Sequence, residues 1–363
     1  MFSTMFEDKL KIRQKSILMD NIQKNFYLAK NDFIATLSPM KVFLILGIQG
    51  GKKLFGLNGF YWTNLGEILN VVLGLLVVGG LGLASVKAKA VDLSGLLAGL
   101  VVGLSIWFFT SWTWFVIIMT FHIAAAAFTK YKYNRKRLLE AAQEKGGARA
   151  WTNVFANGGV ATFLAAMEGL LLMAFPLGNF DIFLAGFIGT VATATADTLA
   201  TEIGLLYPRE PRLITNPLKK VPPGTSGGIT PLGELAILMS GLIIGGIAAM
   251  FYQFNVINVA GGLNGILVKV LEYLGIEAPV WVKLVAISVL AGFIGSTTDS
   301  LIGATLQSLF KCNICGKITE KQIHCGQATT YVKGYLVIDN NIVNLVSTVV
   351  GALAGFLLYL LFF

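Results

Sequence analysis

The sequence is poor in charged residues. Asp, Glu, Lys and Arg together make up 13% of its 363 residues, while 55% of the residues are hydrophobic. Soluble globular domains have about a quarter of their residues charged, so an ordinary soluble fold is excluded. The apolar runs are continuous and do not alternate with polar residues, which argues against a β-barrel. The sequence therefore predicts an all-α, polytopic transmembrane helical bundle.

The N-terminal stretch lacks a long apolar core and contains acidic residues. We therefore do not expect a cleavable signal peptide there. We expect residues 1–63 to form a basic, amphipathic extension that lies on the membrane surface or is partly inserted into it. Residues 64–363 then form the transmembrane domain.

Eight stretches are long and apolar enough to cross a bilayer, which takes about 20 residues per helix. Residues 33–49 are shorter and contain Pro39 and Lys41, so they form either a ninth span or a re-entrant segment. We therefore predict eight or nine spans. The eight clear ones cover approximately residues 65–85, 93–109, 112–128, 154–175, 180–207, 229–254, 281–310 and 335–363.

Lys and Arg are concentrated on one side of the predicted bundle. The loops at residues 86–92, 130–153, 208–228 and 311–334 carry 17 of them, whereas the loops at 110–111, 176–179 and 255–279 carry one. By the positive-inside rule the basic loops face the cytoplasm. Membrane topology thus accounts for the net charge of +9, and no nucleic-acid partner is expected.

Acidic residues interrupt the apolar segments near their predicted cytoplasmic ends. They are Asp197 and Glu202 in the fifth span, Glu234 in the sixth and Asp299 in the seventh. A charge at the bilayer centre costs about 2.5–3.5 kcal/mol, so several in one leaflet imply a hydrated cavity. Oxygen ligands of this kind suit Mg²⁺, and we predict that Asp197, Glu202 and Asp299 hold it. The alternative is that these acids bond neighbouring helices.

The loop LITNPLKKVPPGTSGGITPLGE combines the features of a phosphate site. Two lysines supply positive charge, and a glycine-rich turn supplies backbone N–H groups and hydroxyls. A helix follows, and its N-terminus favours an anion. No Gly-Lys-Ser/Thr follows the turn, so this is not a Walker motif, and an ordinary tight turn is the alternative. The residues concerned are Lys219, Lys220, Gly224, Thr225, Ser226, Gly227 and Gly228.

Amide side chains lie at the predicted cytoplasmic ends of two other spans. The eighth span opens with IDNNIVNLVST, which places Asn341 and Asn344 three residues apart on one helix face, and Asn157 lies near the start of the fourth span. These amides either orient phosphate oxygens and nucleotide or form interhelical hydrogen bonds.

The pentapeptide AGFIG occurs twice, at residues 185–189 and 291–295. Small hydroxyl residues and then an Asp follow each copy. In the predicted topology both helices run in the same direction, so the match suggests a parallel internal repeat. Chance similarity between two glycine-rich helices is the alternative.

The last basic loop contains all three cysteines of the chain and one of its two histidines. In KCNICGKITEKQIHCGQ, four zinc-type ligands occur, opening with a C-x₂-C pair. They are Cys312, Cys315, His324 and Cys325. The alternative is free thiols in a reducing compartment.

These motifs together resemble one integral membrane family, that of the phytyl-phosphate kinases of tocopherol biosynthesis with their archaeal and animal relatives. The resemblance covers about residues 86–363 and rests on ADTLATEIG, KKVPPGTSGGIT, GSTTDSLIGATLQ and DNNIVN, in that order along the chain. It implies that residues 64–363 are a catalytic domain. The implied reaction transfers a phosphoryl group from CTP or another nucleoside triphosphate to an isoprenyl monophosphate.

Phosphoryl transfer requires positioning and charge neutralisation more than covalent chemistry. Asp197, Glu202 and Asp299 would hold Mg²⁺, with Lys219 and Lys220 on the triphosphate. Two other functions fit membrane carboxylates as well. One is a transporter or flippase of a lipid phosphate, and the other is a cytidylyltransferase that forms a CDP-lipid.

Overall fold

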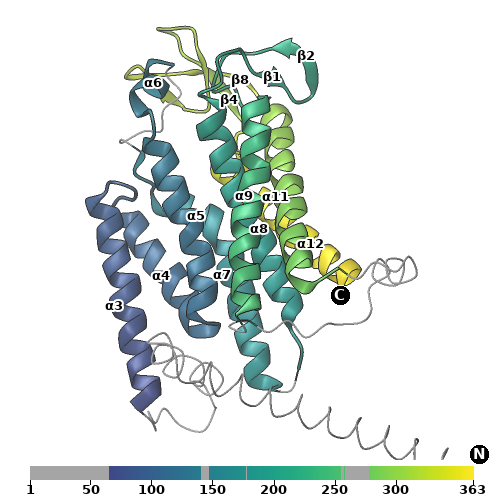
Figure 1. Ribbon diagram of the computed structural model, residues 1–363. Helices are drawn as coiled ribbons and strands as arrows, with labels where there is room; N and C mark the ends of the chain where they lie inside the picture. The colour runs from purple at the N-terminus through teal and green to yellow at the C-terminus, as the bar shows by residue number, and fades with distance from the viewer. Residues whose placement is uncertain (1–64, 140–146, 177, 255–256, 258–277) are drawn as a thin grey trace, which may run out of the picture.

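The computed structural model describes residues 65–139, 147–176, 178–254, 257 and 278–363, and its described part is mostly helical (Figure 1). Each of the eight predicted spans corresponds to one helix, and their mutual packing forms the bundle. The helices are α3 (Leu65–Lys87), α4 (Leu93–Phe109), α5 (Trp112–Lys130), α7 (Trp151–Ala174), α8 (Asp181–Gly204), α9 (Pro231–Gln253), α11 (Val280–Thr305) and α12 (Asn340–Phe362).

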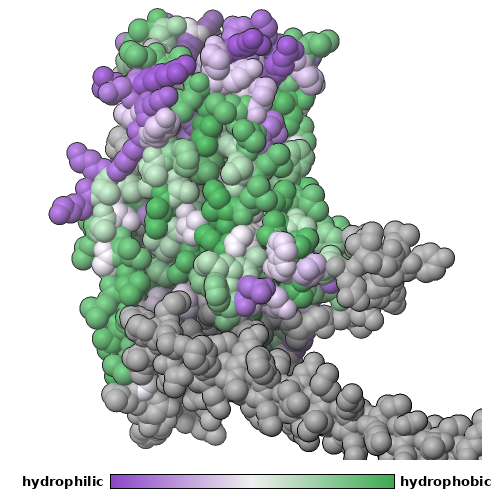
Figure 2. Space-filling view, viewed as in Figure 1, coloured by the Kyte–Doolittle hydropathy of each residue, from purple (hydrophilic) through white to green (hydrophobic). Residues whose placement is uncertain are grey.

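Seven of these helices are long and apolar enough to cross a membrane, and α4, with 17 residues, is shorter. The prediction of a helical membrane bundle is therefore confirmed. The expected extension at 1–63, and with it the segment 33–49, lies outside the described residues. Figure 2 shows hydrophobic surface along the helices, while hydrophilic side chains gather where the basic loops lie.

The basic loops lie together at one end of the bundle, which we call the loop end (Figure 1). There the structure adds three small sheets and the short helix α6 (Tyr133–Leu138), which the all-α prediction did not include. Hydropathy gives no signal for strands of two to five residues. One sheet has the order β2-β1-β3, a second has the order β5-β4-β8, and β6 pairs with β7. Their bounds are β1 (Arg212–Leu213), β2 (Asn216–Lys220), β3 (Gly228–Ile229), β4 (Leu309–Lys311), β5 (Ile318–Thr319), β6 (Ile323–His324), β7 (Gln327–Ala328) and β8 (Thr330–Lys333).

Three helices begin at the loop end with side-chain caps that fix their first turns. Asp92 accepts from the backbone N–H of Gly95 (3.0 Å), and Asp339 accepts from that of Ile342 (2.9 Å). Thr230 caps α9 in the same way, with Pro231 following at the first helical position. Such caps contribute about 1 kcal/mol each and satisfy N–H groups that the helix itself leaves unpaired.

Helix α8 is the centre of the bundle. In its most apolar 18-residue window 78% of the residues are buried, and it packs against α5, α7, α9, α11 and α12. Glycine and alanine allow the close approach, since a Cβ on Gly189 would meet the carbonyl oxygen of Gly351 on α12 and Cβ of Ala291 on α11. Because α8 is central, the polar side chains on it lie inside the protein.

Helices α8 and α11 run in parallel. A Cβ on Gly292 would meet Ala192, and one on Gly295 would meet Thr193, so the contacts advance in the same order along both helices. This is the relative direction that the repeated AGFIG motif predicted. It brings the acids that follow each copy to the same end of the bundle.

We expect Gly189→Ala to destabilise the protein by about 1–3 kcal/mol, because the added methyl group meets backbone that cannot easily move away. The measurement is thermal unfolding in detergent. Gly246→Ala is the matched control, since a Cβ there has nothing within 4 Å and only helix propensity changes. Equal unfolding temperatures for the two variants would contradict the close approach of α8, α11 and α12.

Candidate functional site

A polar cavity of about 390 Å³ lies at the loop end, bounded by α7, α8, α9, α11 and α12 and by three loops. Among the described residues, five carboxylates line it, together with three cations, two hydroxyl-bearing helix faces and the glycine-rich turn at 224–228. The predicted gathering of acids from separate spans is therefore present. The acidic residues that line this polar cavity are Asp197, Glu202, Glu234, Asp299 and Glu320.

Asp197 and Asp299 lie next to each other in the lining of the polar cavity. Because α8 and α11 run in parallel, the two carboxyl groups meet and lie within hydrogen-bonding reach of each other. The hydroxyl of Ser347 on α12 lies close to Asp299 and donates to the carbonyl of Asn344 (2.9 Å). Two carboxylates in contact repel unless a proton or a cation lies between them. The pair therefore offers oxygen donors that would suit a hard divalent cation.

Amide groups hold Asp299 from the side of α12. With the Asn344 amide in the orientation that satisfies both its oxygen and its nitrogen, it donates to Asp299 Oδ2 (3.3 Å), and its side-chain oxygen accepts from Asn157 Nδ2 (3.1 Å). Asn344 and Asn340 line the polar cavity, whereas Asn341 does not. The expectation for Asn341 was wrong by one residue, because a shift of one position turns a helical side chain by about 100°.

Glu202 has a different role from the one predicted. Its Oε2 lies 2.6 Å from Lys136 Nζ and its Oε1 accepts from Thr129 Oγ1 (2.9 Å), with both charged side chains buried. Lys136 reaches this position because α6 folds back onto the end of α5, where Lys136 also donates to the carbonyl of Phe128. Since both oxygens have protein partners, we assign Glu202 to this ion pair and not to the Mg²⁺ ligands.

Lys219 and Lys220 do not line the polar cavity, contrary to expectation. Both lie on β2 with exposed side chains, and Lys220 is 3.9 Å from Glu210. The lining cations are Arg149, Lys317 and Lys321, which come from two other basic loops. Desolvation lowers the pKa of Arg149, while the nearby carboxylates of Glu202 and Asp197 oppose that shift.

The glycine-rich turn lines the polar cavity as predicted for Gly224, Thr225, Ser226, Gly227 and Gly228. Two of its glycines have left-handed backbone, with φ of 80° and 76°. Ser226 Oγ donates to Gln307 Oε1 (2.5 Å), which fastens the turn beside the end of α11. Thr230 then begins α9, so the turn and a helix N-terminus face the same space.

An apolar groove of about 90 Å³ adjoins the polar cavity. It runs between α3, α4, α5 and α7, and Arg149 and Asn153 line both spaces. The Oδ1 atom of Asn153 is buried without a hydrogen-bond partner in the described part of the chain. A cationic and an amide side chain thus stand where the apolar groove meets the polar cavity.

The Cys/His ligand set is assembled at the loop end. The ligand atoms of Cys312, Cys315, His324 and Cys325 all lie within 4.8 Å of one another. His324 also lines the polar cavity, as do the residues at 317–321 between the second and third ligands.

Comparison with known proteins identifies one family. Residues 76–352 match the integral membrane protein family DUF92. Protein PGR of Arabidopsis thaliana is 30% identical over 76% of this chain and 92% of its own length. An uncharacterized membrane protein of Methanocaldococcus jannaschii is 24% identical over 80% of this chain and 95% of its own. Protein VTE6, chloroplastic, also of Arabidopsis, is 27% identical over 45% and 48%. No solved structure matches.

We expect Lys136→Ala to destabilise the protein by about 3–5 kcal/mol, because it leaves the Glu202 carboxylate buried without its counter-charge. The double variant Lys136→Ala/Glu202→Gln removes both charges and is expected to recover most of that loss. Thermal unfolding of the two variants in detergent is the measurement. A double variant no more stable than the single one would show that the pair is not what neutralises Glu202.

Proposed function

Because the chain belongs to the DUF92 family of integral membrane proteins, we propose that it is a membrane phosphotransferase acting on an isoprenyl monophosphate. The donor is CTP or another nucleoside triphosphate. An oxygen of the lipid monophosphate attacks the γ-phosphorus, the bond from that phosphorus to the β–γ bridging oxygen breaks, and the nucleoside diphosphate leaves with the electron pair. The lipid diphosphate is the product.

One observation carries this proposal. The contact between Asp197 and Asp299 lies in a polar cavity whose wall includes a glycine-rich turn and a helix N-terminus, and an apolar groove adjoins it. A triphosphate with its cation needs the first set of features, and an isoprenyl chain needs the groove. Their junction brings a lipid phosphate and a nucleotide within reach of each other.

The two carboxyls fit Mg²⁺ because they offer oxygen donors in direct contact and would otherwise repel. Asp197 and Asp299 would hold the ion, which when bound neutralises phosphate charge. Asn344 orients the Asp299 carboxyl, and Glu234 at the first turn of α9 lies on the nucleotide side of the polar cavity.

The triphosphate is recognised by backbone and by cations. The turn at 224–228 and the start of α9 present N–H groups to an anion. Lys317 and Lys321 line the same polar cavity from the loop at 311–334. In this arrangement they take the part that the sequence suggested for Lys219 and Lys220.

The acceptor phosphate lies at Arg149, where the apolar groove meets the polar cavity. A guanidinium binds phosphate oxygens in a bidentate manner, which fixes the direction of the attacking oxygen. The acceptor is already an anion at neutral pH, so the reaction requires no strong general base.

Incubation of the purified protein with labelled CTP and isoprenyl monophosphates tests the function directly. Formation of lipid diphosphate and CDP supports the kinase. Release of pyrophosphate with a CDP-lipid would assign a cytidylyltransferase instead. Absence of nucleotide turnover, together with lipid-phosphate movement across vesicles, would assign a transporter.

We expect Asp197→Asn and Asp299→Asn each to lower the transfer rate on the order of 10²–10³-fold, as loss of one electrostatic contact to a transition state does. Asp181→Asn is the matched control, because it changes the same side chain at the other end of α8. Initial rates with saturating CTP and Mg²⁺ are the measurement. Full activity of Asp197→Asn would remove this residue from the site.

We expect Gly99→Leu to raise the KM for a long isoprenyl phosphate by about 10-fold or more with little change in kcat, since the new side chain fills the apolar groove. Gly99 lines the groove, and a Cβ there has nothing within 4 Å. Gly159→Leu is the control, because that position has equal space but does not line the groove. Equal KM values for the two variants would place the isoprenyl chain elsewhere.

A further inference from the structure

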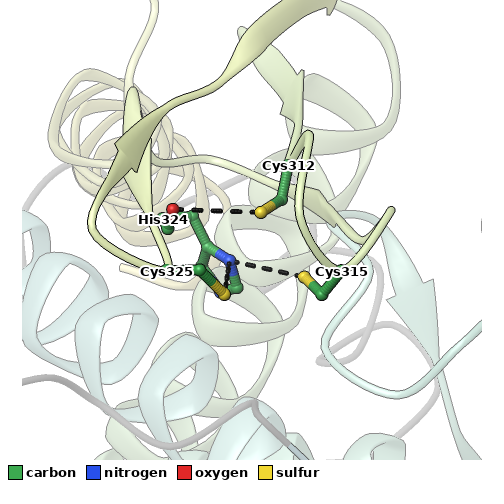
Figure 3. A group of neighbouring side chains, drawn as sticks. All are labelled: Cys312, Cys315, His324 and Cys325. Atoms are coloured by element: carbon green, nitrogen blue, oxygen red, sulfur yellow. Dashed lines mark hydrogen bonds between the residues drawn. The ribbon is translucent and has the colours of Figure 1, made fainter.

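Four metal-ligating side chains converge at the loop end on a segment that the proposed phosphoryl transfer does not use as ligands. Figure 3 shows Cys312, Cys315, His324 and Cys325 pointing toward a common centre. The chain has three cysteines and two histidines in all, so this cluster holds every thiol and half of the imidazoles. Such concentration in one loop suggests a specific role for the group.

The distances within the cluster match a tetrahedral metal site. His324 Nδ1 lies 3.6 Å from Cys315 Sγ and 3.3 Å from Cys325 Sγ. Bond lengths of 2.3 Å to sulfur and about 2.05 Å to nitrogen place a thiolate and an imidazole nitrogen on one tetrahedral zinc ion about 3.5 Å apart. The separations therefore correspond to ligands of one ion.

The backbone presents the ligands from two hairpins. Cys312 and Cys315 lie in the turn between β4 and β5, where the N–H of Gly316 donates to the carbonyl of Cys312 (3.0 Å). The N–H of Ile314 is directed at Cys312 Sγ (3.4 Å), the kind of contact that stabilises a coordinating thiolate. His324 and Cys325 lie at the turn between β6 and β7.

The second turn holds a strained conformation. Cys325 has φ of +51° and Gly326 has φ of +75°, the left-handed pair of a two-residue hairpin turn. A left-handed backbone is unfavourable for a residue with a side chain. It places the Cys325 thiol beside the His324 ring, so the unfavourable backbone conformation occurs where it brings two of the four ligands together.

Burial of apolar side chains contributes little to the stability of the segment at 313–333. Its strands are two to four residues long, and from residue 313 to residue 333 every described side chain is exposed or half-buried. Segments of this kind need a metal or another cross-link to keep one conformation. Coordination of one ion joins the two hairpins and supplies that link.

We propose that Cys312, Cys315, His324 and Cys325 form a structural zinc site that fixes the 309–333 segment over the polar cavity. Zn²⁺ suits the set because three thiolates and one imidazole are among its usual structural ligands and complete a closed tetrahedron. The residues between Cys315 and His324 include Lys317, Glu320 and Lys321, which line the polar cavity. The ion thereby orders the wall that carries two of the three lining cations.

The test measures metal and thiols, not transfer, so it can fail or succeed independently of the proposed phosphotransferase. Full-length protein purified in detergent without chelator is expected to contain about one zinc per chain. Replacement by Co²⁺ is expected to give thiolate-to-cobalt charge-transfer absorption. All three thiols should resist a thiol reagent until a chelator or mercurial removes the ion.

His324→Ala is expected to lose the zinc and the charge-transfer band, whereas His122→Ala keeps both. His122 is the matched control because it is the chain's second histidine and lies on α5, where Ser85 Oγ is 2.9 Å from its ring. Asp197→Asn and Asp299→Asn should also keep the band, which separates this site from the carboxylate pair. Three freely reactive thiols without a cobalt–thiolate band in the unaltered protein, or full zinc in His324→Ala, would overturn the proposal.

Discussion

The carboxylates of Asp197 and Asp299 meet inside an otherwise apolar helical bundle, and much of the surrounding structure serves to accommodate them. Charge in such a place is tolerated only where water, a proton or a cation reaches it. The polar cavity supplies that access from the loop end, and the small residues of α8 allow α11 and α12 to come close enough to enclose the pair. If the helices were further apart, the two carboxylates would not meet. If the bundle had no polar cavity, their charge would be too costly to bury.

The same requirement explains why the acids around the polar cavity are treated differently. Glu202 lies one and a half turns beyond Asp197 on α8, yet its charge is neutralised within the protein by Lys136. Asp197 and Asp299 have each other and the hydroxyl and amide groups of α12, with no lysine at hydrogen-bonding distance among the described residues. A direct ion pair makes Glu202 structural. Asp197 has only the more distant charge of Arg149, which would leave the aspartate pair available for an external cation.

Hydropathy predicted the helices well because a membrane span leaves an unmistakable run of apolar residues. All eight predicted spans contain the observed helices to within a few residues, and the caps at Asp92, Thr230 and Asp339 fix starts that apolarity alone leaves uncertain. The seventh span was predicted too long, since residues 306–310 are apolar enough to extend it but turn into strand β4. Strands this short have no periodicity to detect.

The polar cavity contains the acids and the glycine-rich turn that the sequence indicated, but not the two lysines. An acidic residue within an apolar span is easily recognised in the sequence. A lysine in a loop is not, because the loops contain many lysines and arginines. Lys136 and Arg149 occur in the same basic loop as five other cations. Only the fold, through the position of α6 and the start of α7, shows that these two side chains reach the carboxylates. Lys219 and Lys220 adjoin the turn in sequence, yet β2 directs them to solvent.

The outer wall of the apolar groove has a consequence for selectivity. Helix α3 packs mainly on α4, and only 11% of the residues in its most apolar window are buried, against 78% in α8. In the proposed reaction, a hydrocarbon chain that leaves the groove past α3 would enter the bilayer, and each further isoprene unit would then gain little from contact with the described helices. Discrimination among lipids then falls on the headgroup and the first few carbons, and the relevant substrate concentration is the mole fraction in the membrane.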